Sequence, residues 1–491
     1  MNDLATPVKA HRKIRLGLKE TLARGLSLET VWVFMAIALP IIALLGPKLS
    51  TIDLAYQIRA GQIMLDSHRL LTKDVFTFTA AGTPWLNQQW GAQVIFAAVF
   101  RAGGWPLLTS MRALLAGCIY SFVFLACRSC GLSPKKAAIL TLGSFAVSFG
   151  GLILRPQLLG LTLFALVLWL LVKRVEHPSW TWAIPFVVFV WANVHGSFFL
   201  GPLLLGLAYL EDRYERRPSR GAGIVALVSI LAANLNPFGY RVWLYALGIP
   251  RNPVIANTIV EWRPPSVRSV LGFLFFLSAA AVYTLLARQG RRVPWPSLLT
   301  LVIFFFIGLF AVRGIFWWAL VAPVVVASQL DSSPASSPAN RGLPALNWAL
   351  VLIVVMIGAA SLPWWRTARG DGRLLDHAPV ALTEALRGVP GEERMFNPQI
   401  WGSWFELALP ERKAFVDPRI EVFSESIWHD YDAVSAASTS WQSILDRWSI
   451  QVVVASWRQQ RQLIGALHNA HGWRLIYEDR DGAIFSRFAS G

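Results

Sequence analysis

The residues best suited to chemistry in this sequence are polar side chains that stand at the ends of long apolar runs. The stretch WANVHGSF, residues 191–198, places Asn193 and His195 at such an end, and LRPQLLG places Arg155 at another. An ionisable group beside apolar segments of this length is costly, so each is a candidate for function. An arginine can grip a phosphate through two parallel hydrogen bonds, and a protonated histidine can add a further donor. These residue types predict binding of an anionic group such as a phosphate.

Two carboxylates in the first quarter of the chain are suited to a different task, the removal of a proton from a hydroxyl. Asp53 follows the first apolar run almost at once, and Asp74 precedes the alternating stretch VFTFT. A carboxylate held beside arginine and histidine side chains can serve as a general base. The structural alternative for Asp53 is an N-cap on the helix that LAYQIRAGQIML predicts. We predict Asp53 and Asp74 as the catalytic residues, with Asp53 as the base and Asp74 as a group that positions a substrate.

Further polar residues stand at the ends of later apolar runs, in NPFGYR, VEWRPP and FAVRGIFWW. A single arginine at such an end is usually a side chain that reaches toward water. Several polar residues from five pairs of runs, all on one face of a membrane, would instead form a binding site. The predicted substrate- and phosphate-binding residues are Arg155, Asn193, His195, Asn236, Tyr240, Glu261 and Arg313. No metal ligand is assigned and no cofactor is expected, although a divalent metal stays compatible with the sequence.

The elements that position these residues are apolar runs long enough to cross a membrane. Of the 491 residues, 55% are hydrophobic and only 15% are charged. A ~30 Å hydrocarbon core needs about 20 residues of helix, so such runs predict transmembrane helices. The run at 89–100 is too short to span comfortably and is predicted as an in-plane helix. We predict about eleven spans, at residues 29–47, 105–127, 137–153, 157–172, 180–194, 197–210, 221–235, 268–287, 295–311, 314–330 and 345–364.

Basic residues gather in the short loops between these runs, and this pattern gives the predicted orientation. Cytoplasmic loops of membrane proteins carry an excess of lysine and arginine. The net charge of +17 therefore reflects these loops, and binding of nucleic acid is not expected. Residues 1–28 are predicted as a cytoplasmic basic amphipathic segment, 29–365 as the transmembrane domain and 48–104 as its large first outer loop. The polar residues named above then lie on the outer face.

After Trp365 the composition becomes that of an ordinary globular domain. Short runs such as KAFVDP and IQVVVAS predict strands, whereas SWQSILDRW and RQQRQLIGALHNA have helical spacing. Residues 366–491 therefore predict a small α/β domain on the outer side. The stretch FVDPRIEVF places Asp417, Arg419 and Glu421 at the end of a strand, where open α/β sheets often bind ligands. An internal arginine–carboxylate pair is the favoured explanation for these three residues.

Taken together, these features resemble the GT-C glycosyltransferases. The shared features are an acidic residue just after the first span, a long first outer loop with in-plane helices, and many further spans. Members of this class include protein O-mannosyltransferases, the aminoarabinose transferase of lipid A and oligosaccharyltransferases. The resemblance extends over nearly the whole chain, and it is closest to a group of bacterial membrane proteins of this class. The motifs that carry it are DLAYQIRAGQIM, TKDVFTFTAAGTPW, RPQ, WANVHGSF, NPFG and WGSWFELALP with AFVDPRIEVF.

The resemblance implies a function as well as a fold. Enzymes of this class take a sugar from a polyprenyl phosphate on the non-cytoplasmic side of the membrane. The implied partners are a polyprenyl-phosphate-linked sugar, membrane lipids and an acceptor glycan, lipid or protein. Asp53 matches the acidic residue that acts on the acceptor nucleophile, so inverting transfer at the outer face of the bacterial inner membrane is expected. Ile52 and Leu54 flank Asp53, so the acidic pair of better-known members is missing, as are a D-x-D and a WWD motif.

Two other functions remain open from the sequence. A single acid without the paired motif also suits a non-catalytic scaffold or assembly subunit, which would need a partner protein in a larger membrane complex. A transporter or lipid flippase needs polar residues near the middle of the membrane, such as those of repeated broken helices. The sequence has no recognisable inverted repeat, and its polar residues stand at the outer ends of the runs.

Overall fold

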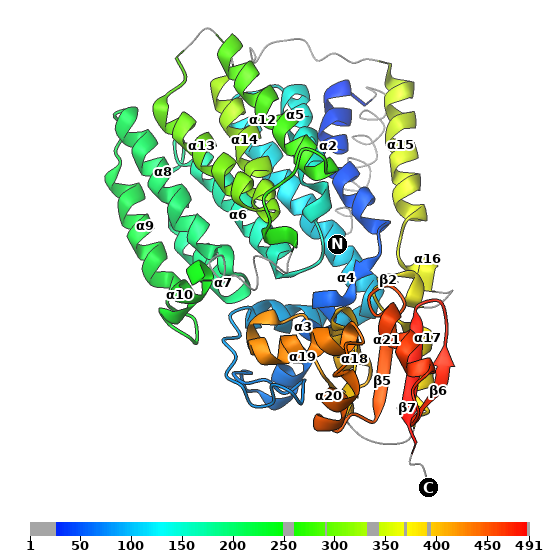
Figure 1. Ribbon diagram of the computed structural model, residues 1–491. Helices are drawn as coiled ribbons and strands as arrows, with labels where there is room; N and C mark the ends of the chain where they lie inside the picture. Colours follow the sequence, from blue (N-terminus) through cyan, green and yellow to red (C-terminus); the bar gives the residue numbers. More distant parts are fainter. Residues whose placement is uncertain are drawn as a thin grey trace, which may run out of the picture.

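The computed structural model describes residues 26–248, 260–289, 292–330, 343–367, 371–389 and 394–488. Long helices form a bundle, and a region that contains a five-stranded sheet lies at one end of that bundle (Figure 1). The predicted basic segment 1–28 lies almost entirely outside the described residues. The expected fold class, a helical membrane protein with a C-terminal α/β region, is confirmed.

Every predicted span coincides with a helix of the bundle. These helices are α2 (Leu28–Leu45), α4 (Trp90–Ser129), α5 (Pro134–Ser148), α6 (Pro156–Lys173), α7 (Ile184–Val194), α8 (Leu200–Tyr214), α9 (Arg220–Ala233), α12 (Val270–Arg288), α13 (Trp295–Phe310), α14 (Ile315–Gln329) and α15 (Pro344–Ala360). In the described part of the chain, six helices are long and apolar enough to cross a membrane. Some of the shorter ones are extended by 3-10 turns, such as η3 (Gly196–Phe199) between α7 and α8.

Local sequence signals set where several helices begin. The Ser27 hydroxyl accepts a hydrogen bond from the Thr30 N–H at 3.2 Å, the N-cap contact that starts α2. Ser269 caps α12 in the same way, through the Gly272 N–H at 3.1 Å. Each cap satisfies a backbone donor that has no partner within the helix, which stabilises the helix by about 1 kcal/mol. The starts of these helices therefore follow from the sequence alone.

Helix α4 changes direction at a pair of glycines. Gly104 has a φ of 58°, a left-handed conformation that glycine adopts without steric cost, and Gly103 also leaves the helical dihedral angles. Residues 90–102 therefore form a separate helical segment ahead of the span predicted at 105–127. The run at 89–100 lies in this first segment, and the helix changes direction directly after it.

The C-terminal region is built around a mixed sheet with the strand order β4-β3-β5-β7-β6. Strand β3 is parallel to β4 and β5, whereas β7 is antiparallel to β5 and β6. The runs KAFVDP and IQVVVAS contain β4 and β5, as their apolar pattern predicted. The elements are β3 (Arg394–Phe396), β4 (Lys413–Ala414), β5 (Val452–Ser456), β6 (Trp473–Glu478) and β7 (Gly482–Arg487), with helices α17 (Val380–Arg387), α18 (Gln399–Ala408), α19 (Glu425–Ser435), α20 (Trp441–Arg447) and α21 (Arg461–His468).

Residues 48–89, which we call the first outer segment, pack against the C-terminal region. Its strand β1 (Leu49–Ser50) pairs with β2 (Leu375–Asp376), and its helix is α3 (Thr51–Ser67). The Ser403 hydroxyl on α18 accepts the Tyr56 N–H at 2.6 Å and donates to the Thr51 carbonyl at 3.1 Å. Aromatic residues of both parts join one hydrophobic cluster. The C-terminal region and residues 49–85 therefore share part of one hydrophobic core.

The basic loops gather at the end of the bundle away from the C-terminal region (Figure 1). Arg174, after α6, and Arg217, after α8, both contact Asp212, at 3.0 Å and 3.5 Å. The start of α13 lies beside them.

Candidate functional site

A cavity of about 460 Å³ lies where the bundle meets the first outer segment and the C-terminal region. Its walls come from elements that are far apart in the sequence. Asp53 lies in the first turn of α3, Arg155 immediately precedes α6, and His195 directly follows α7. Glu261 and Arg313 complete the set, so five of the predicted site residues line one cavity, which we call the polar chamber.

Four of these residues form a continuous series of ion pairs, which we call the ion-pair chain. Arg155 Nε lies 2.8 Å from Asp53 Oδ2, and Arg155 Nη1 lies 2.6 Å from Glu261 Oε1. Glu261 Oε2 then accepts a hydrogen bond from Arg313 Nη2 at 2.9 Å. Two guanidinium groups thus alternate with two carboxylates, and their formal charges cancel. All four side chains remain 21–33% exposed, so a ligand in the cavity can reach them.

The two arginines of the ion-pair chain do not use all of their N–H groups in aligned hydrogen bonds. Arg155 Nε is close to Asp53, yet it has no aligned hydrogen-bond partner among the described residues. That contact therefore depends on charge attraction alone, and a ligand can replace it at low cost. Arg313 Nε is likewise buried without a partner in the described part of the chain, and its guanidinium lies 4.3 Å from the centre of the Trp262 ring. Arg313 is thus held in place by Glu261 and by the Trp262 ring.

Glu261 is the member that links the two arginines. Burial alone would raise the pKa of Glu261, but the charges of Arg155 and Arg313 outweigh that effect and lower the pKa below its ordinary value. Glu261 therefore stays ionised near neutral pH. Its two oxygens orient the two guanidinium groups toward the same cavity.

His195 is held in one tautomer by its neighbours. Its Nδ1 accepts the Ser197 N–H at 3.2 Å and lies 2.7 Å from Ser197 Oγ, which itself accepts the Trp191 Nε1–H at 3.1 Å. With donors directed at Nδ1, the ring is neutral and carries its proton on Nε2. The sequence predicted that a protonated His195 would donate a hydrogen bond. The neutral ring still offers one such donor, the Nε2–H. Gly160 on α6 makes this packing possible, because a Cβ there would lie 3.0–3.3 Å from all three side chains.

A second chamber of about 570 Å³, lined mainly by apolar side chains, adjoins the first. Its wall on α13 includes Val302, Phe306 and Phe310, which are 39%, 60% and 60% exposed. Because α13 belongs to the bundle, these side chains place the mouth of this apolar chamber at the lipid-facing surface. The two chambers share a boundary made of Gln88, Gln89, Gln157, His195, Tyr245, Trp262 and Arg313.

Several residues of the polar chamber were missing from the predicted set. Glu421 comes from the C-terminal region, and Tyr245 donates a hydrogen bond to Glu421 Oε1 at 3.3 Å. Desolvation by the surrounding protein raises the pKa of Glu421, although the residue is exposed at the cavity. Gln57 and Gln88 are each 1% exposed, and each has an amide oxygen without a partner among the described residues. The signal for Gln88 was the amide run NQQW, residues 87–90, directly before an apolar helix.

Three predicted binding residues do not line either chamber. Asn193 Oδ1 accepts hydrogen bonds from Trp90 Nε1 at 2.9 Å and from Asn236 Nδ2 at 3.1 Å. These bonds tie the end of α7 to the start of α4 and to the turn after α9. Tyr240 is 69% exposed. Asn193 and Asn236 therefore join helices, and the position of Tyr240 gives no support for a role in binding.

Asp74 also lies away from the chambers, in a group of side chains that we call the buried ion cluster: Asp74, Glu406, Asp417 and Arg419. Arg419 Nη2 lies 2.5 Å from Asp74 Oδ1, and Arg419 Nε lies 3.0 Å from Asp417 Oδ2. Asp74 Oδ2 also accepts a hydrogen bond from Thr77 Oγ1 at 2.7 Å. The cluster fastens the first outer segment to the C-terminal region. This geometry favours a structural role for Asp74 over the catalytic role predicted from the sequence.

The fold is similar to those of solved membrane glycosyltransferases, whereas no family model and no curated protein matches the sequence. The archaeal oligosaccharyltransferase AglB from Archaeoglobus fulgidus, solved with an inhibitory peptide and a dolichol-phosphate, matches 94% of this chain and 74% of its own, with a TM-score of 0.61 and 12% identity. ArnT from Cupriavidus metallidurans, bound to undecaprenyl phosphate, matches over 93% of this chain and 98% of its own, with a TM-score of 0.53 and 15% identity. Both are GT-C membrane glycosyltransferases, so the GT-C fold expected from the sequence is confirmed.

Proposed function

We propose that this protein transfers a sugar from a polyprenyl-phosphate-linked donor to an acceptor hydroxyl. The observation that carries the proposal is the boundary between the two chambers. An apolar chamber that opens toward lipid meets a polar chamber with three carboxylates and two guanidinium groups. A ligand that fits both must combine a long apolar chain with a polar, anionic head, and a polyprenyl phosphate sugar has this composition.

The two chambers and the boundary between them hold different parts of the donor substrate. The prenyl chain lies along α13 in the apolar chamber. The phosphate lies at Arg313 and His195, which line both chambers and offer a guanidinium and a neutral Nε2–H as donors. The sugar then projects into the polar chamber toward Asp53. The phosphate role that the sequence assigned to Arg155 passes to Arg313, because Arg155 lines only the polar chamber.

The reaction in this arrangement is a single displacement at C1 of the sugar. The acceptor oxygen attacks C1 from the face opposite the phosphate, and Asp53 takes the proton from that oxygen as the new bond forms. The bond between C1 and the phosphate oxygen breaks, and its electron pair leaves with the polyprenyl phosphate. Arg313 and His195 stabilise the charge that builds on that phosphate. The sugar is therefore transferred with inversion at C1, and no metal is assigned a step.

The solved relatives support this proposal through their ligands. AglB was solved with a dolichol-phosphate and ArnT with undecaprenyl phosphate, and each has the fold of this chain. Together with the basic loops at the other end of the bundle, this likeness supports transfer at the outer face of a bacterial cytoplasmic membrane, with the C-terminal region on the periplasmic side. The acceptor, whether a glycan, a lipid or a protein, would enter from that side.

The test is binding of undecaprenyl phosphate to the purified full-length protein in detergent, measured by native mass spectrometry. Arg313→Gln removes the charge at the chamber boundary, so affinity should fall about tenfold or more. Arg101→Gln is the matched control, because Arg101 forms an exposed ion pair with Asp66 away from both chambers. Wild-type affinity in Arg313→Gln, or equal losses in the two variants, would contradict the placement of the phosphate.

A non-catalytic scaffold is the second candidate, and one observation favours it. The ion-pair chain forms without a ligand and carries no net formal charge, so its role on this account is to join four segments of the chain. In that case the removal of one charge would loosen the assembly of the protein with a membrane partner. If a variant that lacks one of these charges loses transfer but still assembles normally with the partner, the protein acts as an enzyme and not as a scaffold.

A further inference from the structure

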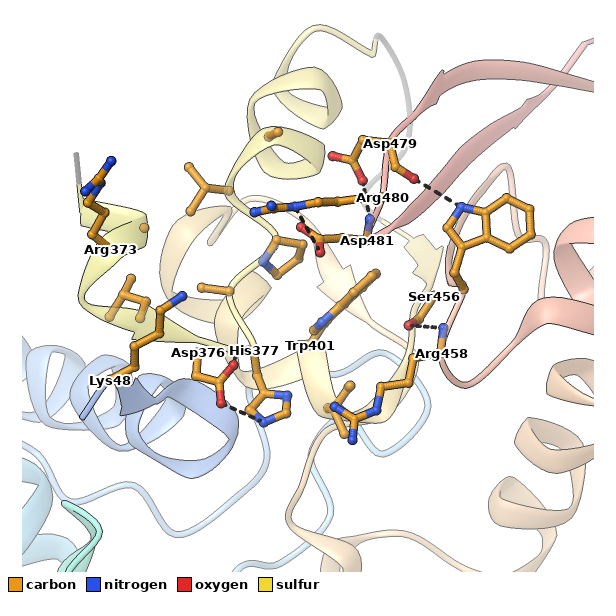
Figure 2. Close-up of a pocket in the computed structure, with 18 of the residues that line it drawn as sticks. Lys48, Arg373, Asp376, His377, Trp401, Ser456, Arg458, Asp479, Arg480 and Asp481 are labelled. Carbon is orange, nitrogen blue, oxygen red and sulfur yellow. Dashed lines mark hydrogen bonds and ion pairs between the residues drawn. The ribbon is translucent and has the colours of Figure 1, made fainter. Parts of the chain in front are cut away.

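A cavity of about 1300 Å³ lies in the C-terminal region, outside the two chambers. Figure 2 shows it between the chain that leaves the bundle, which carries Asp376 and His377, and the ends of sheet strands, which carry Ser456 and Asp479. Ser456 ends β5, and ligands of open α/β sheets commonly bind at such strand ends. We call this space the basic cavity. It shares the residue Ile400, in the first turn of α18, with the polar chamber.

Positive charge dominates the lining of the basic cavity. Six lysine and arginine side chains face three aspartates. The aspartates already have neighbours: Asp376 lies 3.4 Å from His377 Nε2, Asp481 lies 3.9 Å from Arg480 Nε, and Asp479 accepts the Asp481 N–H at 2.8 Å. Within the described residues, none of these three acids forms an ion pair with the other five cations, so the lining keeps a formal excess of three positive charges.

Four of the six cations have no ion pair or side-chain hydrogen bond within the described residues. They are Lys48, Arg373, Arg458 and Arg461. In Figure 2, Lys48 and Arg458 stand on either side of His377. Unpaired cations that converge on one space favour an anion, and arginine in particular matches the geometry of phosphate. The basic cavity is therefore suited to a ligand with at least one phosphate group.

Aromatic side chains add a second feature of the ligand. Trp401, Trp457 and Tyr477 line the same cavity. Trp401 is only 5% exposed, and Trp457 Nε1 donates to the Asp479 carbonyl at 3.1 Å, so both rings are held in place. Fixed rings beside cations suit a ligand that combines flat apolar faces with polar groups. The sugar rings of a phosphorylated saccharide have apolar faces as well as polar groups.

The basic cavity also lies close to the expected membrane surface. Lys48 comes shortly after the end of α2, and Arg366 on α16 (Trp364–Thr367) donates to the Gly46 carbonyl at 2.7 Å. Trp364 and Trp365 are 50% and 65% exposed beside it. Tryptophan is enriched where a protein crosses from lipid to water. A head group attached to a lipid in the bilayer can therefore reach these cations.

We infer that the basic cavity binds the phosphate-bearing saccharide head group of a membrane lipid. Lys48, Arg373, Arg458 and Arg461 hold the phosphate, and the aromatic rings pack against the saccharide. The acyl chains stay in the bilayer next to α2 and α15. The lipid is also the acceptor of the transfer, because its head group lies beside the polar chamber, with which the basic cavity shares the lining residue Ile400. This last step alone rests on the proposed function.

The test is equilibrium binding to the purified full-length protein in detergent, with three probes. The lipid probe is short-chain phosphatidylinositol 4-phosphate, the free probe is inositol 1,4-bisphosphate, and the neutral comparison is short-chain phosphatidylcholine. The variant Arg458→Ala/Arg461→Ala should weaken binding of the lipid probe at least tenfold, since a hydrogen bond to a charged group is typically worth a tenfold change or more. Arg458→Lys/Arg461→Lys keeps the charge and should retain part of the affinity. The matched control is Arg387→Ala/Arg474→Ala, which removes the same charge outside the cavity and should bind as the wild type.

The outcomes separate the sources of the phosphate. Binding of both inositol probes, or of the lipid probe alone, supports the inference, whereas binding of the free probe alone excludes a lipid source and overturns it. Unchanged affinity in Arg458→Ala/Arg461→Ala, or binding of phosphatidylcholine as tight as that of the phosphoinositide, also overturns it. Arg458 and Arg461 line neither of the two chambers. Failure of the proposed donor site would therefore appear in the undecaprenyl phosphate assay and leave this result standing.

Discussion

The ion-pair chain and the buried ion cluster use the same residue types in opposite ways. Each combines arginines with carboxylates from segments that are distant in the sequence. In the ion-pair chain every side chain stays 21–33% exposed to the polar chamber. In the buried ion cluster the Arg419, Asp74 and Asp417 side chains are 0% exposed. Solvent access is thus the first difference between a site that can bind a ligand and one that cannot.

The second difference is how completely the arginines are surrounded. Arg419 contacts two aspartates, and its guanidinium lies 4.7 Å from the Trp85 ring centre and 4.8 Å from that of Phe76. Arg419 Nη1 has no hydrogen-bond partner among the described residues, but the side chain is 0% exposed, so a ligand does not reach it. Arg313, by contrast, has a single ring and a single carboxylate, and it faces two chambers. The comparison indicates that the buried ion cluster stabilises the fold while the ion-pair chain is available for chemistry.

The largest expected effect is the loss of the central arginine from the buried ion cluster. Arg419→Met keeps most of the volume but leaves the buried Asp74 and Asp417 carboxylates without their cation, which typically costs about 3–5 kcal/mol. We expect a strongly lowered thermal unfolding midpoint in detergent. Arg447→Met is the control, because Arg447 pairs with Asp430 while 60% exposed, and such pairs contribute about 0–1 kcal/mol. Equal midpoints for the two variants would remove the distinction between the clusters.

The next effect concerns the ion-pair chain and should appear in activity. Asp53→Asn keeps the shape of the side chain but removes its charge and its basicity. If Asp53 is the base, transfer falls by about 10²–10⁴-fold while expression and the unfolding midpoint stay near those of the wild type. Asp66→Asn, on the same helix and in an exposed ion pair with Arg101, should keep full activity. Normal transfer in Asp53→Asn would rule out the base assignment.

A pH dependence distinguishes the buried ion cluster further. Burial and the neighbouring Asp417 raise the pKa of Glu406 well above its ordinary value. The stability that this group contributes is fully present below its unfolded pKa near 4.3, and it is lost as the pH rises toward the folded pKa. Glu406→Gln is neutral at every pH, so its stability should exceed that of the wild type increasingly above about pH 5, by up to about 1.4 kcal/mol per pH unit. Parallel pH profiles of the unfolding midpoint would show that Glu406 does not titrate in this way.

The smallest expected effect belongs to a residue outside both clusters. Tyr240 is 69% exposed and lines neither chamber. Tyr240→Ala should change neither donor affinity nor transfer rate by more than about twofold, since exposed substitutions usually act within ±0.5 kcal/mol. A large loss of donor affinity in this variant would mean that the binding site extends beyond the two chambers, and that exposure to a chamber does not decide which residues bind the donor.

The features that depend on local sequence could be predicted. Apolar length predicted the eleven helices of the bundle, six of which are long and apolar enough to cross a membrane, and N-cap residues such as Ser27 and Ser269 mark two helix starts. Asp53, Arg155 and His195 were recognisable because a polar residue at the end of an apolar run is unusual wherever it occurs. These signals lie within a few residues of the position concerned.

The remaining features depend on partners that are distant in the sequence. Asp74 and Arg419 are 345 positions apart, so nothing near Asp74 indicates that its charge is already paired. Asn193 has the same chemistry as a ligand residue, but Asn236 and Trp90 occupy its oxygen. Glu421 was considered only as part of an internal pair, because its place in the polar chamber depends on how the C-terminal region packs under the bundle. Burial and pairing thus decided which polar residues belong to the site.

The central claim is that the phosphate of a polyprenyl donor lies at the boundary of the two chambers, beside the ion-pair chain. An experimental structure of the full-length protein with bound undecaprenyl phosphate tests it most directly. We predict phosphate oxygens within about 3 Å of the Arg313 guanidinium and of His195 Nε2, with the prenyl chain along α13. A phosphate found instead in the basic cavity or on the bundle surface, with Arg313 still paired only to Glu261, would contradict the account.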